Sequence, residues 1–274
     1  MLSTDLLDRD RHRTLVMGVL NVTPDSFYDG GTVTTPALAL ARATEMKTDG
    51  AHILDVGGES SRPGAEPVPV ELECERVLPV VEALLPLGLP VSVDTYHAAT
   101  AREALKLGAI MINDVSALRF DPEMVRVVAE TGCDCVLMHM LGTPRTMQQD
   151  PRYDDIVDDI RAFFEERIEY VMRNGVSEEV IWIDPGFGFG KTVEHNLTLL
   201  RRLGEFKVLG RPIVIGTSNK STIGAVLDAP VHDRLEGTAA TVAIAIANGA
   251  NCVRVHNVKA MARVARMTDA ILKA

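Results

Sequence analysis

Eight short apolar runs rich in Val, Ile and Leu recur along the chain of 274 residues. The runs are Leu15–Leu20, His52–Val56, Pro90–Val93, Ala109–Ile112, Cys135–Met138, Val180–Ile183, Pro212–Ile215 and Cys252–Val255. Leucine, alanine and charged residues alternate at helical spacing between them, as at Glu71–Leu85, Ala98–Leu107, Pro122–Thr131, Ile156–Arg173 and Asn196–Leu203. Such a series closes either as a barrel or as a doubly wound open sheet, and eight units of similar size favour the barrel. The sequence therefore predicts an α/β fold, a (β/α)8 TIM barrel.

The alternation runs through the whole chain without a linker rich in Pro, Gly or Ser, so we expect a single domain over residues 1–274. Hydrophobic residues make up 46% of the chain and aromatic residues only 4%, so the apolar content is mostly Val, Ile, Leu and Ala. That composition suits a buried parallel sheet covered by helices.

Charge and cysteine usage narrow the class of partner and the compartment. The formal net charge of −10 argues against nucleic acid or an anionic membrane as a partner, but local basic residues could still bind a phosphorylated small molecule. No apolar run approaches the roughly 18 residues of a membrane span, and the segment MLSTDLLDRDRHR lacks the apolar core of a signal peptide. The scattered cysteines are interpreted as packing residues. We therefore expect a cytoplasmic protein.

A polar residue stands within two positions of the C-terminal end of every predicted strand. These residues are Asn21, Asp55, Asp94, Asn113, His139, Asp184, Thr217 and His256. The C-terminal rim of an α/β barrel is where its active site is built. One such residue could merely open a loop or cap a helix, but eight of them, several beside Gly-rich loops, predict a pocket at this rim.

The first two loops predicted at this rim contain groups suited to an anion and a cation. The loop GGESSRPGAEP places two hydroxyls, one of them on Ser61, beside Arg62 and before Pro63, an arrangement that resembles an oxyanion site. In the loop NVTPDSFYDGG, Asn21 offers a neutral oxygen that could complete a Mg2+ shell otherwise supplied by water and phosphate.

Three polar side chains indicate recognition of a flat heterocycle. Asp94 in SVDT and Asn113 in MINDVS end the third and fourth strands, and Asp184 opens DPGFGFGK after the sixth. A carboxylate can accept two parallel hydrogen bonds from a ring N–H and the adjacent amino group, and the 2-amino-4-oxo edge of a pterin or a guanine presents that pair. No His or Cys accompanies these residues, so heterocycle binding is a better interpretation than a metal cage.

The last two loops contain basic residues. In GTSNKSTIG, Lys220 would point into the mouth of the barrel, and Ser221 with the first N–H groups of a helix could meet an anion. Arg254 and His256 in RVHNV are two residues apart and so lie on the same side of a strand, where both could bind phosphate. Arg254 could also stack its guanidinium on a flat ring.

The motif LMHMLGTPRTMQ follows the fifth strand and contains a histidine that invites assignment as a general base. Because no Ser or Cys nucleophile motif accompanies it, we interpret His139 as a hydrogen-bonded structural residue. Met138 is the more useful neighbour, as an apolar floor for a ring.

Taken together, these segments resemble the dihydropteroate synthase family. The resemblance covers GVLNVTPDSFYDGG, ILDVGGESSRPGA, SVDT, INDVS, LMHMLGTPRTMQ, DPGFGFGK, GTSNKSTIG and VRVH, in the family's order. It implies a transferase that condenses 6-hydroxymethyl-7,8-dihydropterin diphosphate with p-aminobenzoate, giving 7,8-dihydropteroate and diphosphate in folate biosynthesis. It also implies Mg2+ as cofactor, a homodimer, sensitivity to sulfonamides and a dissociative displacement at the pterin methylene, in which diphosphate leaves before the arylamine attacks.

The resemblance also implies roles for individual residues. The candidate catalytic residues are Asp94, Lys220, Arg254 and His256. The pterin would be bound by Asp94, Asn113, Asp184 and Lys220 with Arg254 stacked on it, and the diphosphate by Asn21, Ser61, Arg62, Arg254 and His256, with Mg2+ at Asn21. The p-aminobenzoate pocket would be formed by Ser221, Phe189, Pro63 and the first two loops. Met138 and Gly216 complete the predicted substrate-binding set.

Three positions depart from the family's pattern. Ser61 stands where threonine is usual and keeps the hydroxyl, whereas Asn219 replaces an arginine and Asn257 an aspartate. The last two changes remove one positive and one negative charge. Two alternatives stay open at this point. One is a pterin-binding methyltransferase, which shares the barrel but needs no diphosphate site, so Ser61–Arg62 and RVH argue against it. The other is a non-catalytic paralogue that only binds pterins, which Asn219 and Asn257 favour.

Overall fold

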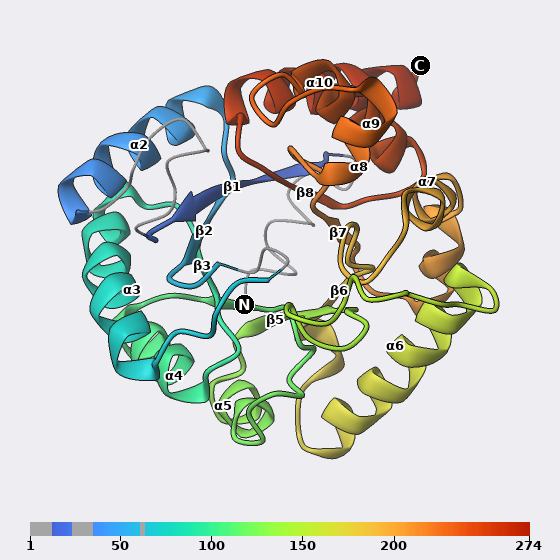
Figure 1. The fold of residues 1–274 in the computed structure, drawn as a ribbon. Helices are drawn as coiled ribbons and strands as arrows, with labels where there is room; N and C mark the ends of the chain where they lie inside the picture. The colour runs from blue at the N-terminus through green and yellow to red at the C-terminus, as the bar shows by residue number, and fades with distance from the viewer. Residues whose placement is uncertain (1–12, 24–34, 61–63) are drawn as a thin grey trace.

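The structure, a computed structural model, describes residues 13–23, 35–60 and 64–274, and it confirms the predicted (β/α)8 barrel (Figure 1). The strands are β1 (Leu15–Asn21), β2 (Ile53–Gly57), β3 (Val91–Asp94), β4 (Met111–Asp114), β5 (Asp134–Met138), β6 (Ile181–Asp184), β7 (Val214–Ile215) and β8 (Cys252–Val255). They pair in parallel in the order β6-β5-β4-β3-β2-β1-β8-β7. A parallel bridge between Ile183 of β6 and Ile213, next to β7, joins the two ends of this order, so the sheet closes on itself.

Helices surround the sheet as an outer ring (Figure 1). The α-helices are α2 (Pro36–Asp49), α3 (Val70–Leu84), α4 (Ala98–Leu107), α5 (Met124–Thr131), α6 (Ile156–Arg173), α7 (Val193–Arg201), α8 (Ser221–Leu227), α9 (Leu235–Ala247) and α10 (Val258–Lys273). Short 3-10 helices lie at η2 (Leu85–Leu87), η3 (Glu178–Val180) and η4 (Leu203–Leu209). Two helices, α8 and α9, therefore lie between β7 and β8, where the other described crossovers have one α-helix each.

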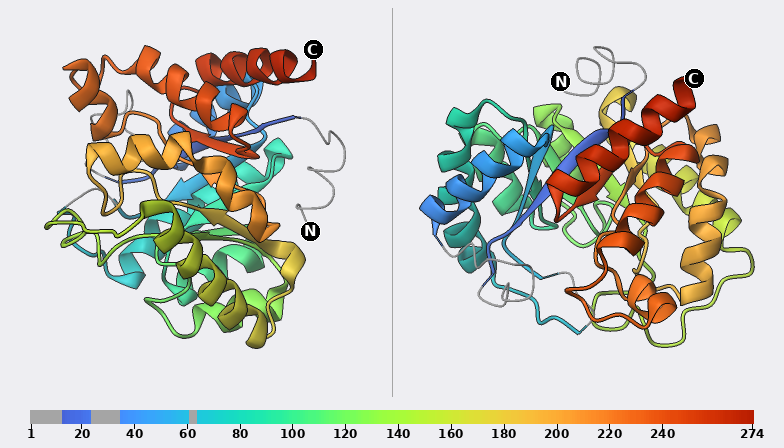
Figure 2. Two further views of the ribbon diagram at one scale, coloured as in Figure 1. Left: turned by 90° about the vertical axis from the view of Figure 1, so that its right-hand side faces the viewer. Right: turned by 90° about the horizontal axis from the view of Figure 1, so that it is seen from above.

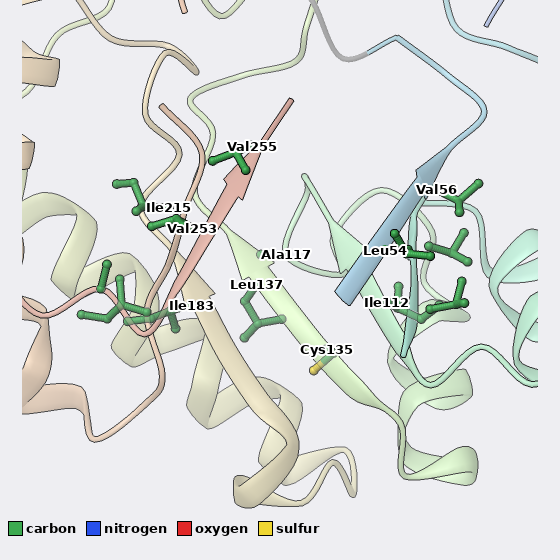
Figure 3. Close-up of a cluster of buried hydrophobic side chains, with 14 of the residues drawn as sticks. Leu54, Val56, Ile112, Ala117, Cys135, Leu137, Ile183, Ile215, Val253 and Val255 are labelled. Carbon is green, nitrogen blue, oxygen red and sulfur yellow. The ribbon is translucent and has the colours of Figure 1, made fainter. Parts of the chain in front are cut away.

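Side chains alternate between the two faces of each strand, and this alternation separates the core into layers. On β2, Ile53 belongs to a cluster inside the barrel to which seven of the eight strands contribute, whereas Leu54 and Val56 belong to the cluster between sheet and helices. Figure 3 shows Leu54, Val56 and Ile112 gathered on that outer side. Asp55 shares the inward face with Ile53, one layer nearer the C-terminal rim. The apolar layer thus forms a floor beneath a polar layer.

The C-terminus of the chain, at the end of α10, lies at the end of the barrel opposite the loops that follow the strands (Figure 2). Between successive strands the chain returns through a helix that runs antiparallel to them, so all the loops that follow the strands lie at the same end of the barrel. Among the described residues, the helices include none that combines the length and apolarity of a membrane span.

Candidate active site

Two of the residues predicted to bind a heterocycle, Asp94 and Asn113, lie in one row across neighbouring strands with Asn21, the predicted metal ligand. The strand register aligns Asn21 with Gly57, Gly57 with Asp94, and Asp94 with Asn113. Each of these residues lies at or near the end of its strand. The structure therefore brings Asn21, Asp94 and Asn113 to one level of the barrel mouth, as the sequence pattern indicated.

Arg254 is held between two carboxylates in the middle of this mouth. Its Nε donates to Oδ2 of Asp55 at 2.6 Å, and its Nη2 donates to Oδ2 of Asp94 at 2.7 Å. The amide of Asn113 donates to the same Oδ2 of Asp55 at 3.1 Å. Two charge-assisted bonds from different strands fix the plane of the guanidinium, which leaves its remaining N–H groups and its face for a ligand.

Burial and charge compete at this cluster. Burial by itself lowers the pKa of Arg254, but Asp55 and Asp94 more than offset it, so the net shift is upward and the guanidinium stays charged. Burial raises the pKa of Asp94 to about 7, and the guanidinium of Arg254 opposes that rise. The direct contact with Arg254 favours the ionised form of Asp94.

Asp55 is a site residue to which the sequence pattern assigned no role beyond its place among the polar strand ends. Its side chain is fully buried and joins Asn113 to Arg254. Its other oxygen, Oδ1, is buried and has no hydrogen-bond partner among the residues that the structure describes. Its position two residues before Gly57, on the inward face of the strand, is the signal that could have identified it.

Asp184 ends β6 and is 6% exposed. Burial raises its pKa to about 6, against the opposing effects of the Gly186 N–H, Lys220 and Arg254. Its Oδ1 accepts a hydrogen bond from Gly186 N at 2.7 Å. Gly186 has a φ of +71°, and a side chain there would place Cβ 1.9 Å from the carbonyl oxygen of His139, so only glycine allows this turn. The glycines of DPGFGFGK thus shape the loop around the carboxylate.

Lys191, at the end of the same motif, is a second residue without a predicted role. Its ammonium Nζ lies 3.0 Å from Nδ1 of His139 and 2.9 Å from the carbonyl oxygen of Phe189. Burial lowers the pKa of Lys191 to about 7 and shifts that of His139 well below its usual value. His139 is therefore a neutral, buried hydrogen-bonding residue, in agreement with the structural role expected for it.

Lys220 and Phe189 meet at the mouth. The Lys220 ammonium lies 4.0 Å from the centre of the Phe189 ring. Lys220 is the residue before α8, and Ser221 is the first residue of that helix. Phe189 also belongs to a small apolar cluster with Met138, which is 4% exposed. The structure thus places Met138, Phe189, Lys220 and Ser221 around one side of the mouth, next to Asp184.

His256 follows β8 directly, on the same face as Arg254. Its Nδ1 lies 2.9 Å from the hydroxyl of Ser218, which also accepts from the His256 backbone N–H at 3.2 Å. Gly216 lies beside Arg254, since a Cβ on Gly216 would come 3.8 Å from that of Arg254. Ser218 therefore orients the histidine ring, a role that the sequence did not assign to it.

Three predicted residues, Ser61, Arg62 and Pro63, lie outside the described residues. The segment that leads to them is held on two sides. Glu59 accepts a hydrogen bond from the Tyr96 hydroxyl at 2.7 Å and from Val68 N at 3.1 Å. Arg76 donates to the carbonyl oxygen of Gly58 at 2.9 Å.

The oxygen atoms near Asn21 suit a cation whose other ligands are phosphate oxygens and water. The Asn21 Oδ1 and Asp94 Oδ2 atoms both lie 3.7 Å from the position that a Cβ on Gly57 would take, so both flank Gly57. Across the described ranges, no three His, Cys, Asp or Glu side chains are grouped as a metal cage. One amide oxygen beside a carboxylate fits Mg2+ that is held mainly by phosphate oxygens and water.

Comparison with known proteins identifies the family. The family model for pterin binding enzymes matches residues 17–256. A dihydropteroate synthase from Synechocystis is 48% identical over 261 residues, which cover 94% of this chain and 90% of that protein. The dihydropteroate synthase of Yersinia pestis, solved with a sulfonamide drug complex, has a TM-score of 0.93 and 42% identity, with 96% of this chain and 95% of that chain covered. The enzyme of Xanthomonas albilineans with 4-aminobenzoic acid has a TM-score of 0.89 and 42% identity, covering 96% and 94%. The chain therefore belongs to the pterin-binding enzyme family, among the dihydropteroate synthases.

Proposed function

We propose that the cluster around Arg254 catalyses the dihydropteroate synthase reaction, in which p-aminobenzoate replaces the diphosphate of 6-hydroxymethyl-7,8-dihydropterin diphosphate. The observation that carries this proposal is the position of Arg254, fixed by Asp55 and Asp94 beside Asn113 and within electrostatic reach of Asp184. Asp94, Asp184 and Asn113 supply acceptors and donors for the pterin edge, and the guanidinium supplies a flat cation beside its ring. The chain is thus a transferase of folate biosynthesis.

The departure of diphosphate is assisted by positive and polar groups at the same mouth. Arg254 and His256 bind its oxygens, together with Ser61 and Arg62 of the second loop. The C–O bond to the pterin methylene breaks with both electrons leaving on the diphosphate. The cation left on the pterin is stabilised by the negative charges of Asp94 and Asp184, which are fixed before the reaction begins.

The arylamine pocket lies on the side of Phe189, Lys220 and Ser221, and the family resemblance adds Pro63, which is outside the described residues. The arylamine nitrogen forms the new bond to the methylene carbon and gives up one proton. No enzyme nucleophile takes part. We infer that sulfonamides, which resemble p-aminobenzoate in shape and charge, compete for this pocket, and the Yersinia pestis relative solved with a sulfonamide drug complex supports that inference.

Mg2+ is the cofactor we propose, with Asn21 as its protein ligand. When bound, it would neutralise charge on the departing diphosphate. Asn21 would hold one coordination position and orient the group at the level of Asp94. Asn21→Ala should therefore weaken diphosphate binding only when Mg2+ is present, which calorimetry with and without the metal would reveal. Equal weakening in both conditions would argue against a metal role for Asn21.

A direct assay tests the proposed reaction. The purified chain with Mg2+ and both substrates should release diphosphate and form dihydropteroate in equal amounts. Release should fall strongly in Arg254→Lys, because the lysine ammonium cannot reproduce the separate contacts of Nε to Asp55 and of Nη2 to Asp94. Pterin binding without diphosphate release would favour the non-catalytic alternative. Methyl transfer without dihydropteroate would favour the methyltransferase.

We further propose that the chain is a homodimer that forms through α9 and α10. An isolated surface helix has a polar outer face, but from Thr238 onward the exposed residues of α9 are Ala240, Ile244 and Ala247, and Glu236 in the first turn is the one exposed charged residue of the helix. Met267 and Ile271 of the adjacent α10 are 62% exposed each. Exposed apolar side chains on two adjacent helices suit contact with a second copy of the chain.

Sedimentation analysis tests the dimer. Ile244→Asp should convert the dimer to a monomer, whereas Val208→Asp, which adds the same charge at a 73% exposed apolar residue of η4, should not. A monomeric parent would exclude the proposal. We also propose a cytoplasmic location, supported by the four cysteines, which are all free thiols.

A further inference from the structure

The β7–α8 segment that contains Lys220 and Ser221 is held in place from α9. Thr241 donates to the hydroxyl of Thr217 at 2.9 Å, and Asn219 N donates to the hydroxyl of Thr238 at 3.3 Å. Thr217 and Thr238 are both nearly fully buried. One face of α9 thus supplies hydrogen-bonding groups to the segment that leads into the mouth of the barrel.

Arg234, the residue before α9, makes the most extensive of these contacts. Its Nη1 donates to the carbonyl oxygens of Asn219 at 2.9 Å and Lys220 at 3.4 Å, and its Nε donates to that of Ala229 at 3.1 Å. Asn219 and Lys220 precede α8, and Ala229 follows it. The guanidinium therefore connects the two ends of a seven-residue helix, which is too short to be stable by itself.

Gly224, in the middle of α8, makes room for this side chain. A Cβ built on Gly224 would lie 2.2 Å from Nη2 of Arg234 and 2.5 Å from its Cζ, so any larger residue must displace the guanidinium. Gly224 has an ordinary helical backbone, and alanine would be a better helix former at that position. Glycine at position 224 therefore stabilises the helix less than alanine would, but it leaves the space in which the Arg234 guanidinium lies across α8.

Lys220 depends on this arrangement. Its ammonium reaches the Phe189 ring, and its carbonyl oxygen accepts from both Arg234 and Ile223 N. A change in the backbone at Asn219 and Lys220 would move the ammonium relative to Phe189 and Asp184. A displacement of about 1 Å in a positioned group can change rates on the order of 100-fold.

We propose that Arg234 is a positioning residue for substrate binding, which sets the place of Lys220 by holding the carbonyl oxygens of Asn219 and Lys220. This inference rests on the proposed role of Lys220 in the pterin and arylamine site. Arg234 itself acts through the backbone and does not touch substrate.

A double-mutant cycle tests the proposal. Arg234→Ala should raise the KM for the pterin diphosphate or for p-aminobenzoate roughly tenfold to 100-fold, with a smaller change in kcat. Gly224→Ala should produce a similar rise, because it displaces the guanidinium. In the Arg234→Ala background, Gly224→Ala should have little further effect, since the side chain it would displace is gone. Arg234→Lys should recover part of the affinity, because the ammonium can still donate to one carbonyl oxygen.

Arg211 provides the matched control at the opposite end of β7. It also donates to two carbonyl oxygens, at 3.3 Å to Leu209 and 2.7 Å to Glu178. Arg211→Ala should lower the melting temperature as Arg234→Ala does and leave both KM values within twofold of the parent.

Lys220→Met distinguishes a failure of the positioning role of Arg234 from a failure of the proposed role of Lys220. If Lys220→Met reduces kcat/KM strongly while Arg234→Ala and Gly224→Ala stay within twofold, the site assignment holds and the role of Arg234 is wrong. Additive effects of Gly224→Ala and Arg234→Ala would also overturn it. If Lys220→Met is itself harmless, the proposed role of Lys220 fails, and the positioning role falls with it.

Discussion

Asp55 and Arg254 face each other inside the barrel mouth, with the Nε atom of Arg254 2.6 Å from Oδ2 of Asp55. The carboxylate is fully buried, whereas the arginine side chain is 19% exposed. Removing a carboxylate from water has a large cost that only a close cation and further hydrogen bonds offset. The buried Asp55 carboxylate lies where the substrate is proposed to bind. We therefore infer that the pair serves to orient Arg254 more than to stabilise the fold.

Asp55→Asn should reduce activity without touching a substrate contact. The amide cannot hold the guanidinium with a charge-assisted bond, and we expect kcat/KM to fall by the equivalent of about 1.5–3 kcal/mol. The matched control is Asp114→Asn, because Asp114 is equally buried but faces outward, where it caps the turn at Ser116 and Leu118. Steady-state kinetics should show a loss in the first variant only. A similar loss of kcat/KM in both variants would mean that the loss follows from removing any buried carboxylate and not from the orientation of Arg254.

Asp184→Asn should abolish tight pterin binding and stabilise the protein at neutral pH. Burial raises the pKa of Asp184 from its ordinary 3.8 to about 6, so its stabilising contribution is present below pH 4 and is lost as the pH rises through 6. Asparagine keeps the acceptor for Gly186 N and does not ionise. Above pH 6 the variant should therefore gain on the order of 1–3 kcal/mol in free energy of unfolding.

Two measurements check this prediction for Asp184. Urea unfolding at several pH values should show that the gain disappears near pH 4, and calorimetry should show pterin affinity reduced by about 1.5–3 kcal/mol. Pterin affinity within twofold of the parent would refute the role of Asp184 in binding. A gain in stability that is independent of pH would refute the electrostatic cause.

Lys191→Met should change how stability depends on pH on the alkaline side. Burial lowers the pKa of Lys191 from 10.5 to about 7, so between these values the unfolded chain binds more protons and the parent becomes more stable as the pH rises. The variant lacks this dependence. The difference between their unfolding free energies should rise by up to about 1.4 kcal/mol per pH unit in that window. Lys106→Met, which removes an exposed lysine, is the control, and parallel curves for parent and Lys191→Met would contradict the prediction.

The barrel could be predicted because its strands are buried on both faces, so that each of them appears in the sequence as a short apolar run. The ends of the elements were harder to place: β7 has only Val214 and Ile215 where four residues were expected, because Ile213 makes a single bridge to β6. Helix α9 could not be predicted from its pattern. Its residues Thr241–Ala247 lack the polar face that marks a surface helix, so their pattern does not distinguish helix from buried strand.

The rim residues could be predicted because the C-terminal ends of parallel strands must meet. Partners across the barrel could not, since the spacing of Asp55 and Arg254 in the sequence does not show that their side chains meet across β1. The role of Lys191 escaped prediction for a related reason: its contacts with His139 depend on how two loops fold over each other. The pattern of a single sequence indicates the face of the strand on which a residue lies. Only the folded barrel shows which side chain from another strand or loop contacts it.

Asn219 should be compatible with full activity, although it replaces the arginine usual in this family. Its φ of +59° lies in the left-handed region, which asparagine tolerates better than longer side chains do. The contacts that hold it use its backbone, since its N–H donates to Thr238 and its carbonyl oxygen accepts from Arg234. Asn257 caps α10 by accepting from Ala260 N at 3.1 Å, and aspartate would cap equally well.

Asn219→Arg should therefore cost about 1 kcal/mol of stability, and Asn257→Asp should be neutral. We expect p-aminobenzoate turnover by the parent, by both single variants and by the double variant to agree within a few fold, and melting temperatures to drop only in the variants that carry Asn219→Arg. An inactive parent with a strongly active double variant would show that the two lost charges are required. The chain would then be a pterin-binding paralogue that has lost catalysis, because the geometry around Arg254 would be present without the groups that bind the arylamine.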